Sequence, residues 1–174
     1  SHSLEELAES GWLTEEAARY LARAVAECRN IVVAGAQGSG VTEVMSALAR
    51  ELPESQSSVA VEAIPNLDID RTRIVSLTAA DSGVTFAETL SHAARLHSEH
   101  LIVNDLSGAD TLAALTAVLG REPGHLLGVH CWSSKDAIEG IVLAAASSGV
   151  DRAAIAQIVG STIDVVISMK RSAE

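Results

Sequence analysis

The stretch of residues 35–42 constrains the fold of this chain more than any other part of the sequence. It reads Gly-Ala-Gln-Gly-Ser-Gly-Val-Thr, follows the apolar run 31–34, and opens the amphipathic run 41–52. The apolar run predicts a buried strand, and apolar residues spaced three and four apart predict a helix. Glycines between them let successive backbone N–H groups turn inward around an anion, at the positive end of the helix. Residues 31–52 therefore predict a strand, an anion-binding loop and a helix.

The spacing of this loop matches the P-loop pattern G-x-x-x-x-G-K-[ST], except that Val41 stands at the lysine position. Lysine places a charge at the outer phosphates, and a charge-assisted hydrogen bond contributes about 1.5–3 kcal/mol. Its absence would weaken phosphate binding by about one to two powers of ten and would slow phosphoryl transfer more strongly. We therefore expect a nucleotide-binding fold that lacks charged residues needed for catalysis. The expected nucleotide-binding residues are Gly35, Gln37, Gly38, Ser39, Gly40, Val41 and Thr42.

The rest of the chain alternates strand-like and helix-like segments. Expected strands cover 31–34, 58–63, 73–78, 101–103, 125–130 and 163–169, with a loop at 104–108. Expected helices cover 4–9, a segment capped by Thr14, 41–52, 84–97, a segment ending at Leu119, 137–146, and a segment capped by Asp151. Such alternation implies an α/β fold with a largely parallel sheet and helices on both faces. The length of 174 residues suits one domain, 1–174.

Composition limits the partners and the compartment. The formal net charge of −11 argues against nucleic acid or an anionic membrane, because both attract Lys and Arg. No apolar run is long enough to span a membrane and no signal peptide opens the chain, so direct membrane insertion is not expected. Cys28 and Cys131 lack metal-ligand spacing, which favours a reduced compartment such as the cytoplasm.

Some aromatic and histidine residues also carry expectations. His92, His97 and His100 lie near one expected helix end, and we expect a solvated surface there rather than a metal site. Trp12 precedes a helix and is expected to pack as a hydrophobic staple. Trp132 either covers the end of the sheet or fills room that a nucleotide would need.

Four landmarks, in this order along the chain, resemble the C-terminal ATPase domain of the secretion superfamily of P-loop ATPases. The landmarks are the loop 35–42, the acidic box 59–67 (V-x-I-E-D-x-x-E-L in the family), the Walker B run 101–108 (I-I-V-G-E-x-R-G) and the histidine box that begins at 128–130 (T-V-H). This superfamily drives type II and type IV secretion and pili, and the likeness is strongest to its tight-adherence, CpaF/TadA-like branch. The resemblance implies a three-layer, RecA-like P-loop fold, without the N-terminal domain that such motors carry.

The resemblance also assigns functional residues. Glu62, Asp105 and His130 become remnant catalytic positions, and Thr42 with Asp105 becomes the Mg²⁺ site. Asp105 is shorter by one methylene than the glutamate of the family. Each residue has a structural interpretation as well. Glu62 could be an exposed edge carboxylate, Asp105 a turn residue at a strand end, His130 a structural histidine, and Thr42 a threonine of the first helical turn.

The departures from the family pattern all affect charged groups, which leaves three hypotheses. Besides Val41, Ala63 and Asn66 stand for acidic-box carboxylates, and Ser107 stands for the Walker B arginine. The first hypothesis is a non-catalytic secretion or pilus ATPase-like protein that acts by assembly or by regulating an active motor. The second is a slow ATPase in which Asp105 still serves and the missing cation comes from elsewhere. The third is a loop that holds another anion or is simply a turn.

Cofactors and partners follow from the same resemblance. ATP or ADP with Mg²⁺ is the implied ligand, and we expect weak binding or none. Rescue of the missing charge looks hard, because the two lysines, Lys135 and Lys170, are far along the sequence from the loop. The implied partners are further copies of the chain, a paralogous secretion ATPase, or inner-membrane secretion platform proteins. The implied location is cytoplasmic, peripheral to the inner membrane through such partners.

Overall fold

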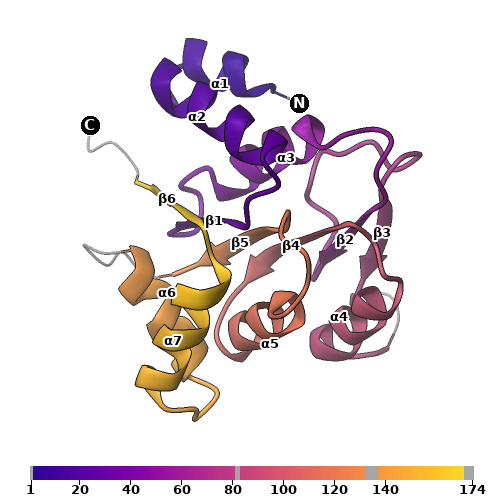
Figure 1. Ribbon diagram of the computed structural model, residues 1–174, viewed down its shortest axis with the longest axis vertical. Coiled ribbons are helices and arrows are strands. Elements are labelled where there is room, and N and C mark those ends of the chain that lie inside the picture. Colours follow the sequence, from indigo (N-terminus) through magenta and orange to yellow (C-terminus); the bar gives the residue numbers. More distant parts are fainter. Residues whose placement is uncertain (1, 81–82, 132–136, 171–174) are drawn as a thin grey trace.

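The computed structural model describes residues 2–80, 83–131 and 137–170 (Figure 1). Helices and strands alternate along these residues, as the sequence pattern predicts. In chain order the elements are α1 (Leu4–Glu9), α2 (Glu15–Ala26), β1 (Ile31–Gly35), α3 (Val41–Glu51), β2 (Ser58–Glu62), β3 (Val75–Thr78), α4 (Phe86–Arg95), β4 (His100–Leu106), α5 (Ala109–Val118), β5 (Leu126–His130), α6 (Ala137–Ala146), α7 (Arg152–Thr162) and β6 (Val165–Met169).

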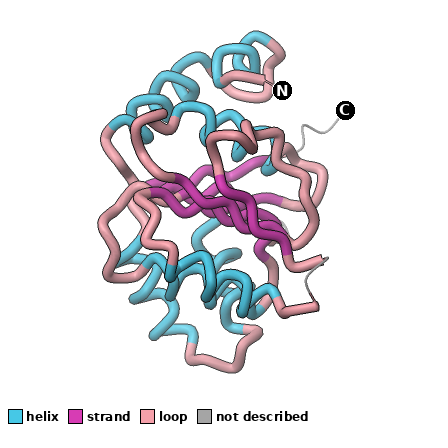
Figure 2. Tube along the Cα trace, turned by 90° about the vertical axis from the view of Figure 1, so that its right-hand side faces the viewer, coloured by secondary structure: helices cyan, strands magenta, loops and turns pink. Residues whose placement is uncertain are grey.

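The strands pair in parallel in the order β3-β2-β4-β5-β1-β6. Helices α1, α2 and α3 lie on one side of this sheet, and α4 to α7 lie on the other (Figure 1). In the side view of Figure 2 the twisted sheet separates two helical layers. The predicted three-layer α/β fold is therefore confirmed. Within the described ranges, no helix has both the length and the apolar character needed to cross a membrane.

Strand β1 shows how the sequence builds both sides of the core. Ile31 and Val33 belong to the apolar cluster formed with α1, α2 and α3, whereas Val32 and Ala34 belong to the cluster formed with α4 to α7. Successive side chains of a strand alternate between its faces. Because helices cover both faces of a parallel sheet, both sets of side chains must be apolar. The uninterrupted apolar run in the sequence is the result.

The structure corrects two predictions at the ends of strands. The loop predicted at 104–108 is wrong at its start, since β4 continues to Leu106 with an irregular register after Val103. Within it, Asp105 has a φ of +60°, a left-handed conformation that Asp tolerates better than most residues. Glu62 ends an inner strand, because β3 pairs outside β2, and it is fully buried. Its interpretation as an exposed edge carboxylate is therefore wrong.

The prediction that His92, His97 and His100 lie on a solvated surface is right for two of the three residues. His92 and His97 are exposed, but His100 is buried. Its Nδ1 donates to the Gly124 carbonyl at 2.7 Å, and its Nε2 is hydrogen bonded to the Gln56 side chain at 2.8 Å. No group of three or more His, Cys, Asp or Glu residues in the described ranges could hold a metal ion.

His125, just before β5, is a buried neutral histidine. Its Nδ1 accepts a hydrogen bond from the Leu101 N–H at 3.0 Å, so the neutral ring carries its proton on Nε2. Burial, together with the nearby positive charge of Arg121, lowers the pKa of His125 to about 4 from its ordinary 6.5. The unfolded chain therefore binds a proton at this position before the folded protein does.

Acidification from pH 6.5 to about 4 should lower the free energy of unfolding by up to about 3 kcal/mol through His125. The substitution His125→Asn keeps an acceptor for the Leu101 N–H and removes the titrating ring. Urea unfolding of both proteins between about pH 7 and pH 4.5 measures the difference. We expect a smaller loss of stability on acidification in the variant, and an equal loss in both proteins would contradict this assignment.

Candidate functional site

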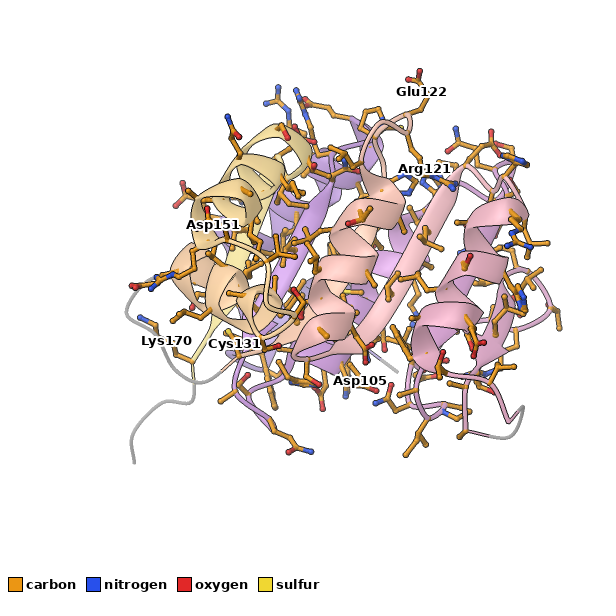
Figure 3. All side chains as sticks on the ribbon, turned by 90° about the horizontal axis from the view of Figure 1, so that it is seen from below. Asp105, Arg121, Glu122, Cys131, Asp151 and Lys170 are labelled. Atoms are coloured by element: carbon orange, nitrogen blue, oxygen red, sulfur yellow. The ribbon has the colours of Figure 1, made fainter. Side chains whose placement is uncertain are left out.

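Parallel pairing brings the carboxyl ends of the strands to one edge of the sheet. Gly35 ends β1, Glu62 ends β2, and Asp105 lies near the end of β4. His130 ends β5, and Lys170 directly follows β6. In open parallel sheets ligands bind at this edge, beside the N-termini of the following helices. Figure 3 shows Asp105 and Lys170 along one edge of the molecule.

The loop between β1 and α3 is an open nest of backbone donors. Gly38 and Gly40 have φ values of +76° and +96°, which favour glycine. In the described part of the chain, the N–H groups of Gly38, Gly40, Val41 and Thr42 have no hydrogen-bond acceptor. The Ser39 hydroxyl is also unpaired, although this residue is 6% exposed. Free donors around one point, at the positive end of a helix, fit an anion.

Close packing on the outside of the loop fixes its shape. A Cβ on Gly40 would lie 2.3 Å from the Trp12 ring, and a Cβ on Gly35 would lie 2.3 Å from the Ser39 hydroxyl. The indole expected to act as a helix staple thus lies against the phosphate-loop glycine, while remaining 47% exposed. Trp132, the other tryptophan of interest, lies outside the described residues. Both glycines are required because neighbouring groups leave no room for a side chain.

The Val41 side chain points into the core. It is 2% exposed and belongs to the apolar cluster that contains α3. A Cβ on Gly128 of β5 would lie 3.3 Å from Val41 Cγ1 and 3.1 Å from Met45 Cγ, so both side chains pack against this glycine. The position that holds an amine in the P-loop pattern is a packing position in this protein.

A hydrogen-bonded cluster, which we call the amide cluster, lies beside the loop and consists of Thr42, Asn66, Asn104, Asp105 and His130. Asn104 donates to Thr42 Oγ1 at 3.3 Å and to Asn66 Oδ1 at 3.0 Å. Asn66 donates to Asp105 Oδ2, while His130 Nε2 donates to Asp105 Oδ1 at 3.0 Å. Donors from this chain therefore engage both carboxylate oxygens of Asp105. The structure brings three of the predicted residues together and adds two asparagines.

Asn104 is the buried centre of the amide cluster. It is 0% exposed, and its Oδ1 has no hydrogen-bond partner among the described residues. A Cβ on Gly128 would lie 2.3 Å from this oxygen. The absence of a side chain on the neighbouring strand is thus what gives the amide its space.

His130 is held as a charged partner of Asp105. The hydrogen bond from its ring to Asp105 raises the pKa of His130, and the charge of the carboxylate adds to this effect, whereas partial burial opposes it. A histidine whose pKa is raised on folding stabilises the protein below the unfolded pKa of 6.5, and this contribution is lost as pH rises through the folded value. The hydrogen bond to Asp105 therefore favours the protonated form of the His130 ring.

Glu62 organises the turn after β2. Its Oε1 accepts hydrogen bonds from the N–H groups of Asn66 and Leu67, both at 2.7 Å. Its Oε2 pairs with Arg71 at 3.1 Å. These bonds place the Asn66 side chain beside Asp105, so Glu62 positions the amide cluster through the backbone. No hydrogen bond in the described ranges joins Glu62 to Thr42, Asp105 or His130.

The expected Mg²⁺ site at Thr42 and Asp105 does not fit the metal. Mg²⁺ needs oxygen lone pairs arranged in a near-octahedral shell. Here amide and imidazole N–H groups point at the Thr42 hydroxyl oxygen and at both Asp105 oxygens. Asparagine amides supply hydrogen to these oxygens where acidic side chains would supply further ligands. Each of these three oxygens already accepts a hydrogen bond, so a divalent cation would have to compete with the donor.

Two clefts flank the loop, and both include Ala36, Gln37 and Cys131. The first, of about 290 Å³, lies on the β6 side and is also lined by Ser39 and Lys170, among others. The second, of about 320 Å³, lies on the β5 side and is also lined by Ser107 and His130. Lys170 was discounted for its distance in sequence from the loop, yet it lines the same cleft as the loop residues.

Sequence reasoning missed the roles of Asn66, Asn104 and Lys170. The family pattern marks Asn66 only as a replaced carboxylate, and the predicted loop 104–108 contains Asn104. A polar residue directly after an apolar β-strand run signals the carboxyl edge of a parallel sheet, and that signal was available for Asn104 and Lys170 alike. Contact between them and the loop depends on strand order, which the sequence did not reveal.

Comparison with known proteins agrees with this architecture. No model of a known protein family matches the chain. The type IV secretion system protein VirB11 of Bartonella henselae is 27% identical over 161 residues, which cover 87% of this chain and 45% of that protein. The crystal structure of the Brucella suis VirB11 ATPase in complex with sulphate superposes with a TM-score of 0.78 at 24% identity, over 99% of this chain and 59% of that one.

A pilus motor shares the fold as well. The retraction motor PilT with bound ADP superposes with a TM-score of 0.71 at 14% identity, over 96% of this chain and 47% of that one. At these identities the two structural likenesses establish the fold alone. The chain spans about half the length of the relatives it matches.

Gly128→Ala should destabilise the protein by about 1–3 kcal/mol, because overpacking forces neighbouring groups to move. The new methyl group would meet Asn104 Oδ1, Met45 Cγ and Val41 Cγ1. Gly160→Ala in α7 is the matched control, since no atom lies within 4 Å of its Cβ position. The control should be neutral or stabilising by up to about 1 kcal/mol in urea unfolding. Equal stability of Gly128→Ala and wild type would refute the packing of Asn104 against Gly128.

Asp105→Asn should lower the pKa of His130 toward its ordinary value, because the hydrogen bond to a carboxylate is what raises it. NMR titration of the His130 ring resonances measures this change. Asp70→Asn, which removes a carboxylate from a surface turn, is the control and should leave the His130 titration in place. A His130 curve that is unchanged in Asp105→Asn would show that the two side chains are not paired in solution.

Proposed function

Because this chain is homologous to the secretion-superfamily P-loop ATPases, we propose that it is a non-hydrolysing member that binds through its loop and acts by assembly. Relatives include a type IV secretion system protein, and the fold is shared with a secretion ATPase and a pilus motor. The chain keeps the fold of these ATPases and the glycine-rich loop. The features lost are the charged groups that phosphoryl transfer requires.

The main support for this proposal is that the Asp105 carboxylate already accepts hydrogen bonds from Asn66 and His130. A general base must offer a free lone pair to the water it activates. Asn66 and His130 occupy one oxygen each, and Asn104 Nδ2 lies 3.4 Å from Oδ1. The side chain is 19% exposed. Three hydrogen-bond donors of the protein therefore compete with a water molecule for the lone pairs of Asp105.

The buried Val41 supports the same conclusion from the other side of the loop. Transition-state stabilisation of phosphoryl transfer depends on positive groups placed at the transferring phosphate. At position 41 the side chain packs on Gly128 and supplies no charge. Loss of a positioned charge commonly reduces kcat by two to three powers of ten, at about 1.4 kcal/mol for each.

The proposed mode of action is association. Further copies of the chain or a paralogous secretion ATPase are the proposed partners, together with inner-membrane secretion platform proteins on the cytoplasmic side. In this role the protein would occupy a place in a motor assembly without consuming ATP. ATP or ADP is the proposed ligand of the loop, with Mg²⁺ contributing little.

With ATP and Mg²⁺, the purified chain should release phosphate no faster than a blank without protein. Asp105→Ala is the matched variant, and its rate should equal that of the wild type. Val41→Lys supplies the missing amine, since a lysine stem can replace the valine contacts while its amine reaches the loop. That variant should bind ADP about 10- to 100-fold more tightly in calorimetry and still not turn over. Hydrolysis by the wild type that disappears in Asp105→Ala would establish a slow ATPase instead.

A further inference from the structure

Lys170 stands next to the anion-binding loop because of strand pairing. Strand β6 runs parallel to β1, with Met169 opposite Gly35. The two strands therefore end at the same level, where Lys170 follows β6 and Ala36 follows β1. In Figure 3 Lys170 and Cys131 are labelled at the same end of the molecule. The two segments are remote in sequence and adjacent in space.

The cleft on the β6 side is chemically suited to an anion. Its lining residues are Ala34, Gly35, Ala36, Gln37, Ser39, Cys131, Ala137, Ser168, Met169 and Lys170. No carboxylate is among these residues, although the whole chain carries a net charge of −11. Among the described residues of this lining, Lys170 is the charged one. In the described ranges it has no carboxylate within ion-pair distance.

A second, independent observation points to a ligand in the same cleft. Ser39 lines it, is 6% exposed, and has a hydroxyl without a partner. A buried hydroxyl that makes no hydrogen bond is costly, and native structures seldom leave one without a reason. The free N–H groups of Gly38 and Gly40 belong to the same loop. The unpaired Ser39 hydroxyl and Lys170, which has no ion-pair partner among the described residues, thus line one cleft.

We propose that Lys170 is the cation of this site, standing in for the amine that position 41 lacks, and that the ligand is a phosphate or diphosphate group. This inference rests on the proposed function for the site itself and adds the residue that recognises the charge. Lys170 lines the cleft on the β6 side and is exposed, whereas His130 lines the cleft on the β5 side. A phosphate held by Lys170 is therefore drawn away from the Asp105–His130 pair. Binding without hydrolysis follows from this placement.

Isothermal calorimetry on the full chain tests the proposal, with pyrophosphate, ADP and adenosine as probes. The variants are Lys170→Gln, which removes the charge, and Lys170→Arg, which keeps it. Arg19→Gln is the matched control, because it removes one positive charge from the exposed face of α2. Lys170→Gln should weaken binding of pyrophosphate and ADP by about 10- to 100-fold. Lys170→Arg should remain within a few-fold of wild type, and Arg19→Gln should not differ from it.

Salt and the choice of probe supply the further tests. Added salt should weaken pyrophosphate binding to the wild type more than to Lys170→Gln, because screening acts on the charge that the variant lacks. Adenosine should not bind measurably. If Lys170→Gln binds pyrophosphate as tightly as the wild type, or if adenosine binds as well as ADP, the assignment of Lys170 is wrong.

The failure of this inference and that of the proposed function can be told apart. A wild-type chain that binds neither pyrophosphate nor ADP at millimolar concentration overturns the role of Lys170 and leaves the absence of hydrolysis standing. ATP hydrolysis that is lost in Lys170→Gln supports the role of Lys170 and overturns the non-hydrolysing function.

Discussion

The parallel pairing of β1 with β5 on one side and β6 on the other is the constraint on which the site depends. It fixes Gly35 at the level of His130 and of Met169. Every polar group of interest then emerges at one edge, because parallel strands present their carboxyl ends together. The apolar faces of these strands are covered by helices on both sides, so polar side chains gather at the edge where the strands end. The anion-binding loop, the amide cluster and Lys170 are consequences of this single arrangement.

At that edge, the polar side chains of the amide cluster form hydrogen bonds with one another. Asp105 is bonded to Asn66 and His130, and the Asn104 amide reaches Thr42. Of these side chains only Asn104 is fully buried, and its hydrogen bonds tie the partly exposed Asp105 and Thr42 side of the cluster to the core. Asp105 retains a left-handed backbone, a strained conformation of the kind found at functional sites. Both carboxylate oxygens of Asp105 thus accept hydrogen bonds from within the protein.

The loop between β1 and α3 differs from the amide cluster, because the backbone N–H groups of Gly38 and Gly40 have no acceptor among the described residues. The Val41 side chain is buried in the core. In our proposal the positive charge that contacts the anion comes from Lys170 after β6 and not from the first residue of α3. An ammonium at the far side of the loop can still attract phosphate, since Coulomb attraction depends on distance and environment rather than on the element that supplies the charge. Catalysis is more demanding, because it requires the charge at the transferring phosphate. Binding and turnover can therefore be separated within one P-loop fold.

The sequence by itself determined the element order, the parallel sheet and the loop, because apolar periodicity and glycine spacing are local signals. Motif order also predicted that Thr42, Asp105 and His130 belong to one site, and the structure brings these three residues together. Tertiary structure alone decided that Glu62 is buried in a turn and that Asn66 and Asn104 close around Asp105. It alone placed Lys170 beside a loop far away in the chain. The physical reason is that strand order and burial depend on which segments pair across the sheet, and no local pattern encodes that choice.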